Sequence, residues 1–93
     1  MAGYTILKSG VWRMDTRTAV AERLLQLCEQ KRISVNALAR SAAVPPSTLK
    51  NIINGGSRNA GIVTIKKLCD GMDISLFEFF NTDVFKELEQ EIK

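Results

Sequence analysis

Polar side chains in the segment 46–54 have the chemistry needed to recognise nucleobases. Ser47, Lys50 and Asn51 carry a hydroxyl, an ammonium and a carboxamide group, and a carboxamide can form two hydrogen bonds with adenine. On a helix these residues would share the side opposite an apolar stripe. The apolar residues of that stripe are Leu49, Ile52 and Ile53. The segment is therefore a candidate DNA-reading helix.

Two prolines place this helix after a sharp bend. Val44 precedes Pro45 and Pro46, and because a residue before a proline is pushed out of the helical region, an earlier helix must end near Ala43. Pro46 suits the first position of the next helix, where its missing N–H would have had no intrahelical partner. The glycines of the sequence 54–56 then end that helix, since glycine adopts the left-handed conformation without a clash.

A second short helix is predicted directly before the bend. Ser34 suits its N-cap, because the serine hydroxyl can accept a hydrogen bond from an otherwise unpaired backbone amide. Apolar residues then recur at helical spacing on one face, and they are Val35, Leu38, Ala39 and Ala42. Residues 34–54 are therefore predicted to form two helices around a tight turn.

A longer helix is predicted before this unit. It begins at Thr16 or Arg17, runs to Lys31, and has Asp15 or Thr16 as its cap. The residues expected to face inward are Val20, Leu24, Leu27 and Cys28. Those expected to face outward are Arg17, Arg23, Lys31 and Arg32. The role of this helix is structural.

Two more helices are predicted after a glycine-rich loop. Thr64 can cap the first, which ends near residues 70–71 and buries Ile65, Leu68 and Cys69. Ser75 and Glu78 have the spacing of a capping box for the second. Its apolar residues, expected to close the core rather than to form a ligand cage, are Leu76, Phe77, Phe79 and Phe80.

The two ends of the chain leave alternatives open. Residues 81–93 are predicted to form an amphipathic helix too short to persist alone, so it must pack on its own domain or on a second subunit. The stripe that would make either contact is Val84, Phe85, Leu88 and Ile92. Residues 1–13 show no helical period, and we interpret them as a mobile extension before a domain of residues 14–80. Docking of their apolar side chains, or DNA contact by Lys8 and Arg13, is the alternative.

Composition limits the possible functions. The 93 residues are 45% hydrophobic and 25% charged, which is typical of a single globular domain and leaves no room for a second catalytic one. No apolar run approaches the roughly 20 residues that cross a bilayer, and the N-terminus lacks an export signal, so a cytoplasmic protein without membrane partners is expected. Without histidine an enzyme is not expected. Cys28 and Cys69 lack partners at metal-ligand spacing, so neither a metal nor a cofactor is predicted.

Charge is distributed unevenly along the chain. Residues 1–60 contain nine Lys and Arg against three Asp and Glu, a balance of +6, whereas residues 61–93 contain four against seven, a balance of −3. The basic half includes the two-helix unit. A locally positive surface favours binding to the phosphates of a duplex, although a solvated surface of uneven charge would give the same pattern.

Residues 17–80 resemble the phage-repressor (Cro-like, xenobiotic-response-element-type) helix-turn-helix family. The resemblance rests on an ordered set of small, apolar and turn positions rather than on one dipeptide. These positions are Leu38-Ala39, Ala43, Val44, Ser47, Leu49, Ile52, Asn54-Gly55, Leu68 and Asp73-Ile74-Ser75-Leu76. The resemblance implies an all-α fold, a compact bundle of five short helices with a C-terminal amphipathic helix added, in which the second helix of the motif lies in the major groove.

The resemblance also implies which side chains meet double-stranded DNA. The expected base contacts are Pro46, Ser47 and Asn51, with Lys50 beside them. The expected phosphate contacts are Asn36, Arg40, Thr48, Asn54 and Arg58. The chain departs from the family at two positions. Val35 replaces a common phosphate-binding glutamine, for which Arg40 or Asn36 can substitute, and Ile53 replaces a common glutamate.

The predicted function is that of a sequence-specific DNA-binding transcriptional regulator of the repressor type. It would bind a palindromic operator as a dimer in the cytoplasm, and it would be encoded by a bacterium or by a phage. The alternative is a protein-interaction module, antitoxin-like or an anti-repressor adaptor, that keeps the fold but binds through the C-terminal stripe, because fold alone does not fix function.

Overall fold

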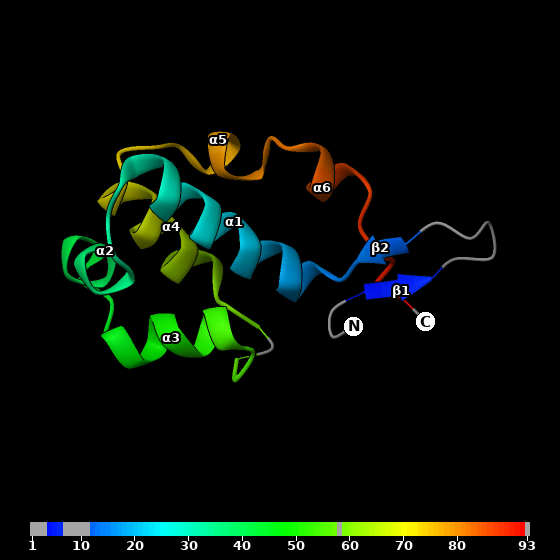
Figure 1. The fold of residues 1–93 in the computed structure, drawn as a ribbon, viewed down its shortest axis with the longest axis horizontal. Coiled ribbons are helices and arrows are strands. Elements are labelled where there is room, and N and C mark those ends of the chain that lie inside the picture. The colour runs from blue at the N-terminus through cyan, green and yellow to red at the C-terminus, as the bar shows by residue number, and fades with distance from the viewer. Residues whose placement is uncertain (1–3, 7–11, 58, 93) are drawn as a thin grey trace.

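The computed structural model describes residues 4–6, 12–57 and 59–92, and shows an all-α domain with a small strand pair at one end (Figure 1). The fold class predicted from the sequence is confirmed. The elements in chain order are β1 (Tyr4–Ile6), β2 (Trp12–Met14), α1 (Thr16–Lys31), α2 (Val35–Ala42), α3 (Pro46–Asn54), α4 (Ile62–Gly71), α5 (Leu76–Phe80) and α6 (Asp83–Lys86). In Figure 1, α1 crosses the middle of the domain, with α3 along its lower side and α5 and α6 along its upper side.

One core joins the first five helices. Each of them contributes a side chain with no exposed surface, and burying such a side chain stabilises the fold by about 1.5–3 kcal/mol. These side chains are Leu24 of α1, Leu38 of α2, Leu49 of α3, Leu68 of α4 and Phe79 of α5. The apolar periodicity read from the sequence therefore identified these five core residues correctly.

Three helix starts follow the predicted capping chemistry. Asp15 caps α1, where its Oδ1 accepts a hydrogen bond from the Thr18 N–H at 2.8 Å. Ser34 caps α2 by accepting from the Ala37 N–H at 3.0 Å. Ser75 caps α5 by accepting from the Glu78 N–H at 2.9 Å. Each contact satisfies one backbone donor that the first turn of a helix leaves unpaired.

The start of α4 differs from the prediction. The predicted N-cap was Thr64, whereas the helix begins at Ile62 and its N-cap is Gly61, whose carbonyl accepts from the Ile65 N–H at 3.1 Å. Glycine is itself an acceptable N-cap. The helix therefore includes residues 62–64, which a cap at Thr64 would have left outside it. As a result Ile62 and Val63 are displayed on the first turn of α4.

Phe77 does not close the core as predicted. Its neighbour Phe79 is completely buried, and Phe80 packs edge-on against both Phe79 and Phe85. Phe77 instead remains 75% exposed. In a helix of five residues, a residue one position after Leu76 is rotated by roughly 100° from it, so both cannot face the same core.

The C-terminal helix is present but shorter than predicted. It ends at Lys86, and the chain then extends along the strand pair, where the Glu89 N–H donates to the Met14 carbonyl at 3.1 Å. Three glutamates occupy alternate positions from 87 to 91. Carboxylates near a helix C-terminus oppose the helix dipole, which disfavours continuing the helix.

The apolar stripe of this segment is divided by the fold. Phe85 packs against the core through Phe79 and Phe80, and Leu88 is half-buried. Val84 and Ile92 remain 44% and 89% exposed. Of the two alternatives left open by the sequence, packing on the same domain therefore holds for Phe85.

The strand pair was not predicted. β1 and β2 are antiparallel, with Tyr4 opposite Met14, Thr5 opposite Arg13 and Ile6 opposite Trp12. Residues 1–3 and 7–11 of the predicted extension lie outside the described part of the chain. Its mobility and the domain boundary at residue 14 stay predictions.

Candidate nucleic-acid interface

The bend between α2 and α3 is as sharp as the prolines predict. Ala43 ends α2 in the left-handed conformation, with φ 55° and ψ 38°, and Val44 follows as a buried residue whose N–H donates to the Ala39 carbonyl at 3.0 Å. Pro46 occupies the first position of α3. The two helices are thus separate elements, and the turn between them is fixed by the backbone and by burial of Val44.

Helix α3 presents a polar ridge to the outside. Leu49 and Ile52 are 0% and 3% exposed, and they anchor α3 on the core. The outward residues, all exposed, are Pro46, Ser47, Thr48, Lys50, Asn51 and Asn54, which we call the α3 ridge. Every α3 residue proposed from the sequence to meet DNA belongs to this ridge.

The first turn of α3 offers backbone donors as well. No side chain caps it, and its first internal hydrogen bond runs from the Leu49 N–H to the Pro45 carbonyl at 3.2 Å. The N–H groups of Ser47 and Thr48 precede that bond and have no carbonyl in an earlier turn. Together with the positive end of the helix dipole they suit an anionic oxygen such as that of a phosphate.

Asn51 lies in the second half of the ridge, where the loop that follows α3 comes back to contact the helix. Its backbone carbonyl accepts from the Ser57 N–H at 3.1 Å. Its side chain lies against Gly56, since a Cβ built on that glycine would be 3.3 Å from Asn51 Oδ1. The loop therefore lies against one side of Asn51, whose side chain remains exposed.

Two of the predicted phosphate-contacting residues lie on α2. Asn36 and Arg40 are both exposed and are spaced by four residues, so they are neighbours on one side of the helix. Arg58 lies outside the described residues. Helices α2 and α3 contact each other, and each exposes the residues predicted on it to contact DNA.

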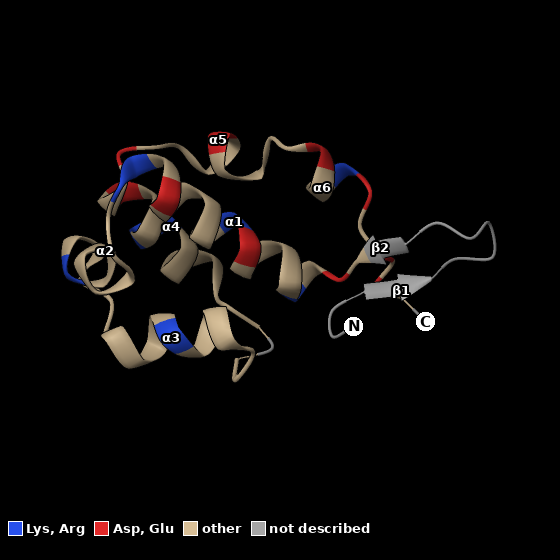
Figure 2. Cartoon of the chain, in the orientation of Figure 1, with Lys and Arg blue, Asp and Glu red and all other residues tan. Residues whose placement is uncertain are grey.

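The two helices lie in an interval without acidic residues. Between Glu29 and Asp70 the sequence contains no Asp or Glu, and α3 carries Lys50 as its charged residue (Figure 2). The basic residues of the interval are Lys31, Arg32, Arg40, Lys50, Arg58, Lys66 and Lys67. Figure 2 shows acidic residues on α5 and α6, at the edge of the molecule away from α3. The comparison of residues 1–60 with residues 61–93 had underestimated this separation of charge, because Lys66 and Lys67 were counted with the acidic half.

Arg17 was wrongly predicted to face outward. Its Nη2 donates to Thr18 Oγ1 at 3.0 Å, and its guanidinium lies under Gly55, where a Cβ would be 3.3 Å from Nη1. Nη1 is buried and has no hydrogen-bond partner among the described residues. The sequence did hold the signal, since Arg17, Val20 and Leu24 have the spacing of one helical face. Arg17 therefore connects the start of α1 to the end of α3.

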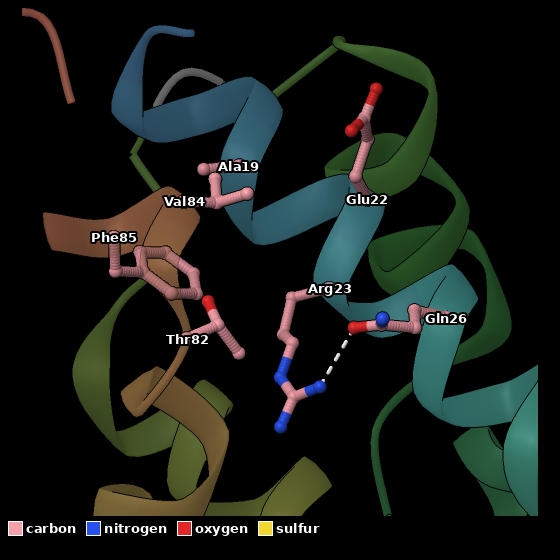
Figure 3. A pocket seen from close by; sticks show the side chains of 7 residues that line it. All are labelled: Ala19, Glu22, Arg23, Gln26, Thr82, Val84 and Phe85. Atoms are coloured by element: carbon pink, nitrogen blue, oxygen red, sulfur yellow. Dashed lines mark hydrogen bonds between the residues drawn. The ribbon is translucent and has the colours of Figure 1, made fainter. Parts of the chain in front are cut away.

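Arg23 is also less exposed than predicted, and it fastens α5 to α1. Its Nε donates to the Phe79 carbonyl at 2.7 Å, and its Nη2 donates to the Glu78 carbonyl at 2.8 Å. Its Nη1 donates to Gln26 Oε1 at 2.7 Å, as the dashed line in Figure 3 shows. The hollow beside Arg23 has a volume of about 200 Å³, below the roughly 300 Å³ of the smallest usual ligand sites. Arg23 is a structural residue there.

Both cysteines are buried thiols, as predicted. Burial raises the pKa of the Cys28 thiol above its ordinary value. Burial also raises the pKa of the Cys69 thiol, with a further contribution from the negative charge of Asp70.

Among the residues that the structure describes, no group of three or more Cys, Asp and Glu is arranged to hold a metal ion. In the same part of the chain, no helix is long and apolar enough to span a bilayer.

Comparisons with known proteins agree with this geometry. Residues 23–83 match the model of the Cro/C1-type HTH DNA-binding domain, and no curated protein sequence matches the chain. Among solved structures, the prophage Lp1 protein 11 is 32% identical with a TM-score of 0.71, over 81% of this chain and 100% of that one. The restriction-modification controller protein C.AhdI from Aeromonas hydrophila is 30% identical with a TM-score of 0.63, over 69% and 96%. An HTH_3 family transcriptional regulator from Vibrio cholerae is 28% identical with a TM-score of 0.67, over 73% of this chain and 38% of that one.

Proposed function

The chain belongs to the Cro/C1-type helix-turn-helix DNA-binding family and is a DNA-binding transcription regulator, and from this premise we propose that it acts as a repressor on a palindromic operator. The observation that carries the proposal is the α3 ridge, which the bend at residues 43–46 turns outward while Leu49 and Ile52 hold α3 on the core. We place its action in the cytoplasm of a bacterium, encoded there or by a phage, because it must reach operator DNA.

Base recognition is assigned to the ridge. Asn51 is suited to adenine, with which a carboxamide pairs bidentately, and Lys50 is suited to the O6 and N7 acceptors of guanine. Ser47 can donate to or accept from either kind of base edge, and Pro46 contributes an apolar surface for a thymine methyl group. All four are exposed on one side of α3, which supports this assignment.

Phosphate contacts are assigned to the flanks of the ridge. Such contacts fix the register of a protein on the duplex and carry no sequence information directly. The residues proposed for them are Asn36 and Arg40 on α2, Thr48 and Asn54 on α3, and Arg58 in the following loop. The interval without acidic residues supports this, since nothing negative in it would repel the backbone.

A homodimer is part of the proposal. A palindrome presents two identical half-sites about 34 Å apart, which a two-fold pair of recognition helices can match. Val84 and Ile92 of the C-terminal stripe remain exposed and are available to a second subunit. Repression would follow from occupancy, because a bound dimer covers DNA that polymerase needs.

Selection of bound sequences from a random duplex pool tests the proposed function. A two-fold symmetric consensus with half-sites one helical turn apart is expected, followed by discrete retained fragments in gel shifts at two salt concentrations. An interaction module, the alternative function, would enrich no sequence and retain no fragment at either salt concentration. That outcome would overturn the proposal.

A further inference from the structure

A hollow lies between the start of α1 and the end of α3. Its volume is about 950 Å³, which is within the roughly 300–1,000 Å³ of most small-molecule sites. Polar residues from four parts of the chain line it, and they include Thr16, Arg17, Asn54, Ser57 and Glu91. In Figure 1 the start of α1 and the loop that follows α3 both lie toward the strand pair. We call this space the α1–α3 hollow.

The hollow also has an apolar side. It is lined by Val20, Ile52, Ile65 and Phe80, which belong to the core or pack against it. The first three are buried and Phe80 is half-buried. Because these residues come from α1, α3, α4 and α5, the packing of the core fixes this side in place. An apolar wall combined with a few polar groups is the usual lining of a small-molecule site.

Arg17 brings an unsatisfied hydrogen-bond donor to the hollow. Its Nη2 donates to Thr18 Oγ1 at 3.0 Å, whereas its Nη1 is buried and has no partner in the described part of the chain. A buried N–H without an acceptor is costly, and it is rare in folded proteins. The carboxylates at the hollow already have donors, since Asp15 accepts from the Thr18 N–H and Glu91 accepts from Thr16 Oγ1 at 3.1 Å. The Arg17 guanidinium is therefore the group that a bound acceptor would satisfy.

We propose that the α1–α3 hollow binds a small carboxylic acid with an apolar body, whose carboxylate pairs with Arg17 and whose body lies on the apolar side. A guanidinium and a carboxylate form strong, charge-assisted hydrogen bonds. A singly charged acid suits the hollow better than a phosphate monoester, because Asp15 and Glu91 repel the second negative charge of the phosphate. The ligand class is an aliphatic or aromatic acid of about the size of octanoate.

Gly55 couples this site to the DNA-reading helix. It is the C-cap of α3 and follows Asn54 of the α3 ridge, and a Cβ built on it would be 3.3 Å from Arg17 Nη1. A carboxylate that reaches Nη1 must therefore displace Gly55. Ligand binding then loosens the end of α3 and weakens DNA binding, and DNA weakens ligand binding by the same factor. This regulatory part rests on the proposed function, whereas ligand binding itself does not.

Titration of the free protein with octanoate, followed by NMR of the backbone amides, provides the first test. Octanoate has about ten non-hydrogen atoms and should bind with a Kd on the order of 0.1–1 mM, with large shifts at Gly55 and Ser57. Octanamide has a similar body without the charge and should bind at least about 10-fold more weakly. Octyl phosphate should bind no more tightly than octanoate. Absence of saturable octanoate binding, or tighter binding of either of the other two compounds, would overturn the proposal.

Two substitutions that each remove one positive charge separate the hollow from a general attraction of anions to a basic protein. Arg17→Met should weaken octanoate binding at least about 10-fold. Lys67→Met is the matched control, since Lys67 is an exposed residue of α4 that does not line the hollow, and it should leave the Kd unchanged. An equal effect of the two substitutions would show that Arg17 does not hold the carboxylate.

A substitution that fills the hollow provides a test without a change of charge. Ala60 lines the hollow and is half-buried against the core, so Ala60→Phe should occupy part of the space and weaken octanoate binding. Ala37→Phe is the control, because Ala37 is a half-buried alanine of α2 outside the hollow. The amide spectra report whether each variant is folded. A folded Ala60→Phe variant that binds octanoate like the wild type would contradict the assigned position.

DNA binding at saturating octanoate tests the regulatory part. The affinity for the selected operator should fall at least about 5-fold, and in Arg17→Met it should not fall. An operator affinity that octanoate leaves unchanged in the wild type overturns the coupling. Octanoate binding by a protein that recognises no DNA sequence rejects the repressor function and supports the ligand site, whereas selection of a palindrome without octanoate binding supports the function and rejects the site.

Discussion

Gly71 of α4 lies against Ala42 of α2 so closely that a Cβ on Gly71 would be 3.0 Å from both the Cβ and the backbone N of Ala42. Any side chain there would have to push α2 away from α4. Because α2 carries Asn36 and Arg40 and leads directly into the turn before α3, this contact sets the position of the proposed DNA-binding surface.

Gly71→Ala is therefore expected to destabilise the domain. Overpacking a close helix contact costs about 1–3 kcal/mol, which outweighs the gain of up to about 1 kcal/mol from the better helix propensity of alanine. The free energy of unfolding in urea measures the effect. Gly61→Ala is the comparison, since nothing lies within 4 Å of its Cβ position, and its loss should be limited to the roughly 0.5–1 kcal/mol by which alanine is a poorer N-cap than glycine. Equal stability of both variants would show that α2 and α4 can separate freely.

The two arginines of α1 should respond differently to the same substitution. Arg17→Met gives up one hydrogen bond to Thr18 Oγ1 but also removes a buried nitrogen that has no partner in the described residues. The two effects oppose each other, so the free energy of unfolding should stay within about 1 kcal/mol of the wild-type value. Arg23→Met breaks three hydrogen bonds and leaves two carbonyls of α5 unpaired, a loss of about 2 kcal/mol. Urea unfolding of both variants provides the comparison. An equal loss of unfolding free energy in the two variants would mean that the Arg17 guanidinium makes stabilising hydrogen bonds like those of Arg23.

Two outward substitutions should separate base recognition from phosphate binding. Asn51→Ala is expected to weaken specific binding by about 1–3 kcal/mol and to relax the preference at one base pair. Arg40→Ala should weaken binding to all sequences alike and lower the slope of log K against log salt by about 1. Arg58→Ala is expected to behave like Arg40→Ala. Binding isotherms at several salt concentrations on the operator and on random DNA measure these effects, and identical profiles for Asn51→Ala and Arg40→Ala would reject the assignments.

The buried thiols predict a loss of stability at alkaline pH. Burial raises the pKa of Cys28 and of Cys69 above the ordinary value of 9.0, so the unfolded chain releases these protons first. Their contribution to stability is fully present below about pH 9 and is lost as the pH rises toward the folded pKa. The variant Cys28→Ala with Cys69→Ala should be less stable at pH 7 because of the cavities, yet should lose less stability than the wild type between pH 8 and 10. Parallel pH profiles of the two proteins would contradict this explanation.

Local chemistry made the centre of the fold predictable. The prolines at 45 and 46 act on their immediate neighbours, and the spacing of Leu49 and Ile52 fixes which side of α3 is buried, so the turn and the exposed ridge followed from the sequence. Asp15, Ser34 and Ser75 act as caps within three residues of their partners, and these contacts were equally accessible.

Features that depend on distant contacts were not predicted. Arg17 is drawn under Gly55 by the end of a helix more than thirty positions away in the sequence, and the C-terminal segment follows β2 instead of continuing as a helix. Phe77 is exposed because the core accepts Phe79 and Phe80 from a helix of only five residues. Periodicity places Arg17 on the buried side of α1, but it does not reveal that Gly55 covers the guanidinium. The path of residues 87–92 and the exposure of Phe77 likewise reflect competition for space between elements.

Sequence selection with a variant that lacks the base-contacting side chains of the α3 ridge tests the central claim most directly. Replacing Ser47, Lys50 and Asn51 together by alanine removes the proposed base contacts without touching the core, so unfolding in urea should stay close to that of the wild type. The account predicts that the wild type enriches one symmetric consensus from a random duplex pool and that the triple variant enriches none while keeping weak, salt-sensitive binding. Enrichment of the same consensus by both proteins would show that sequence is read by some surface other than α3.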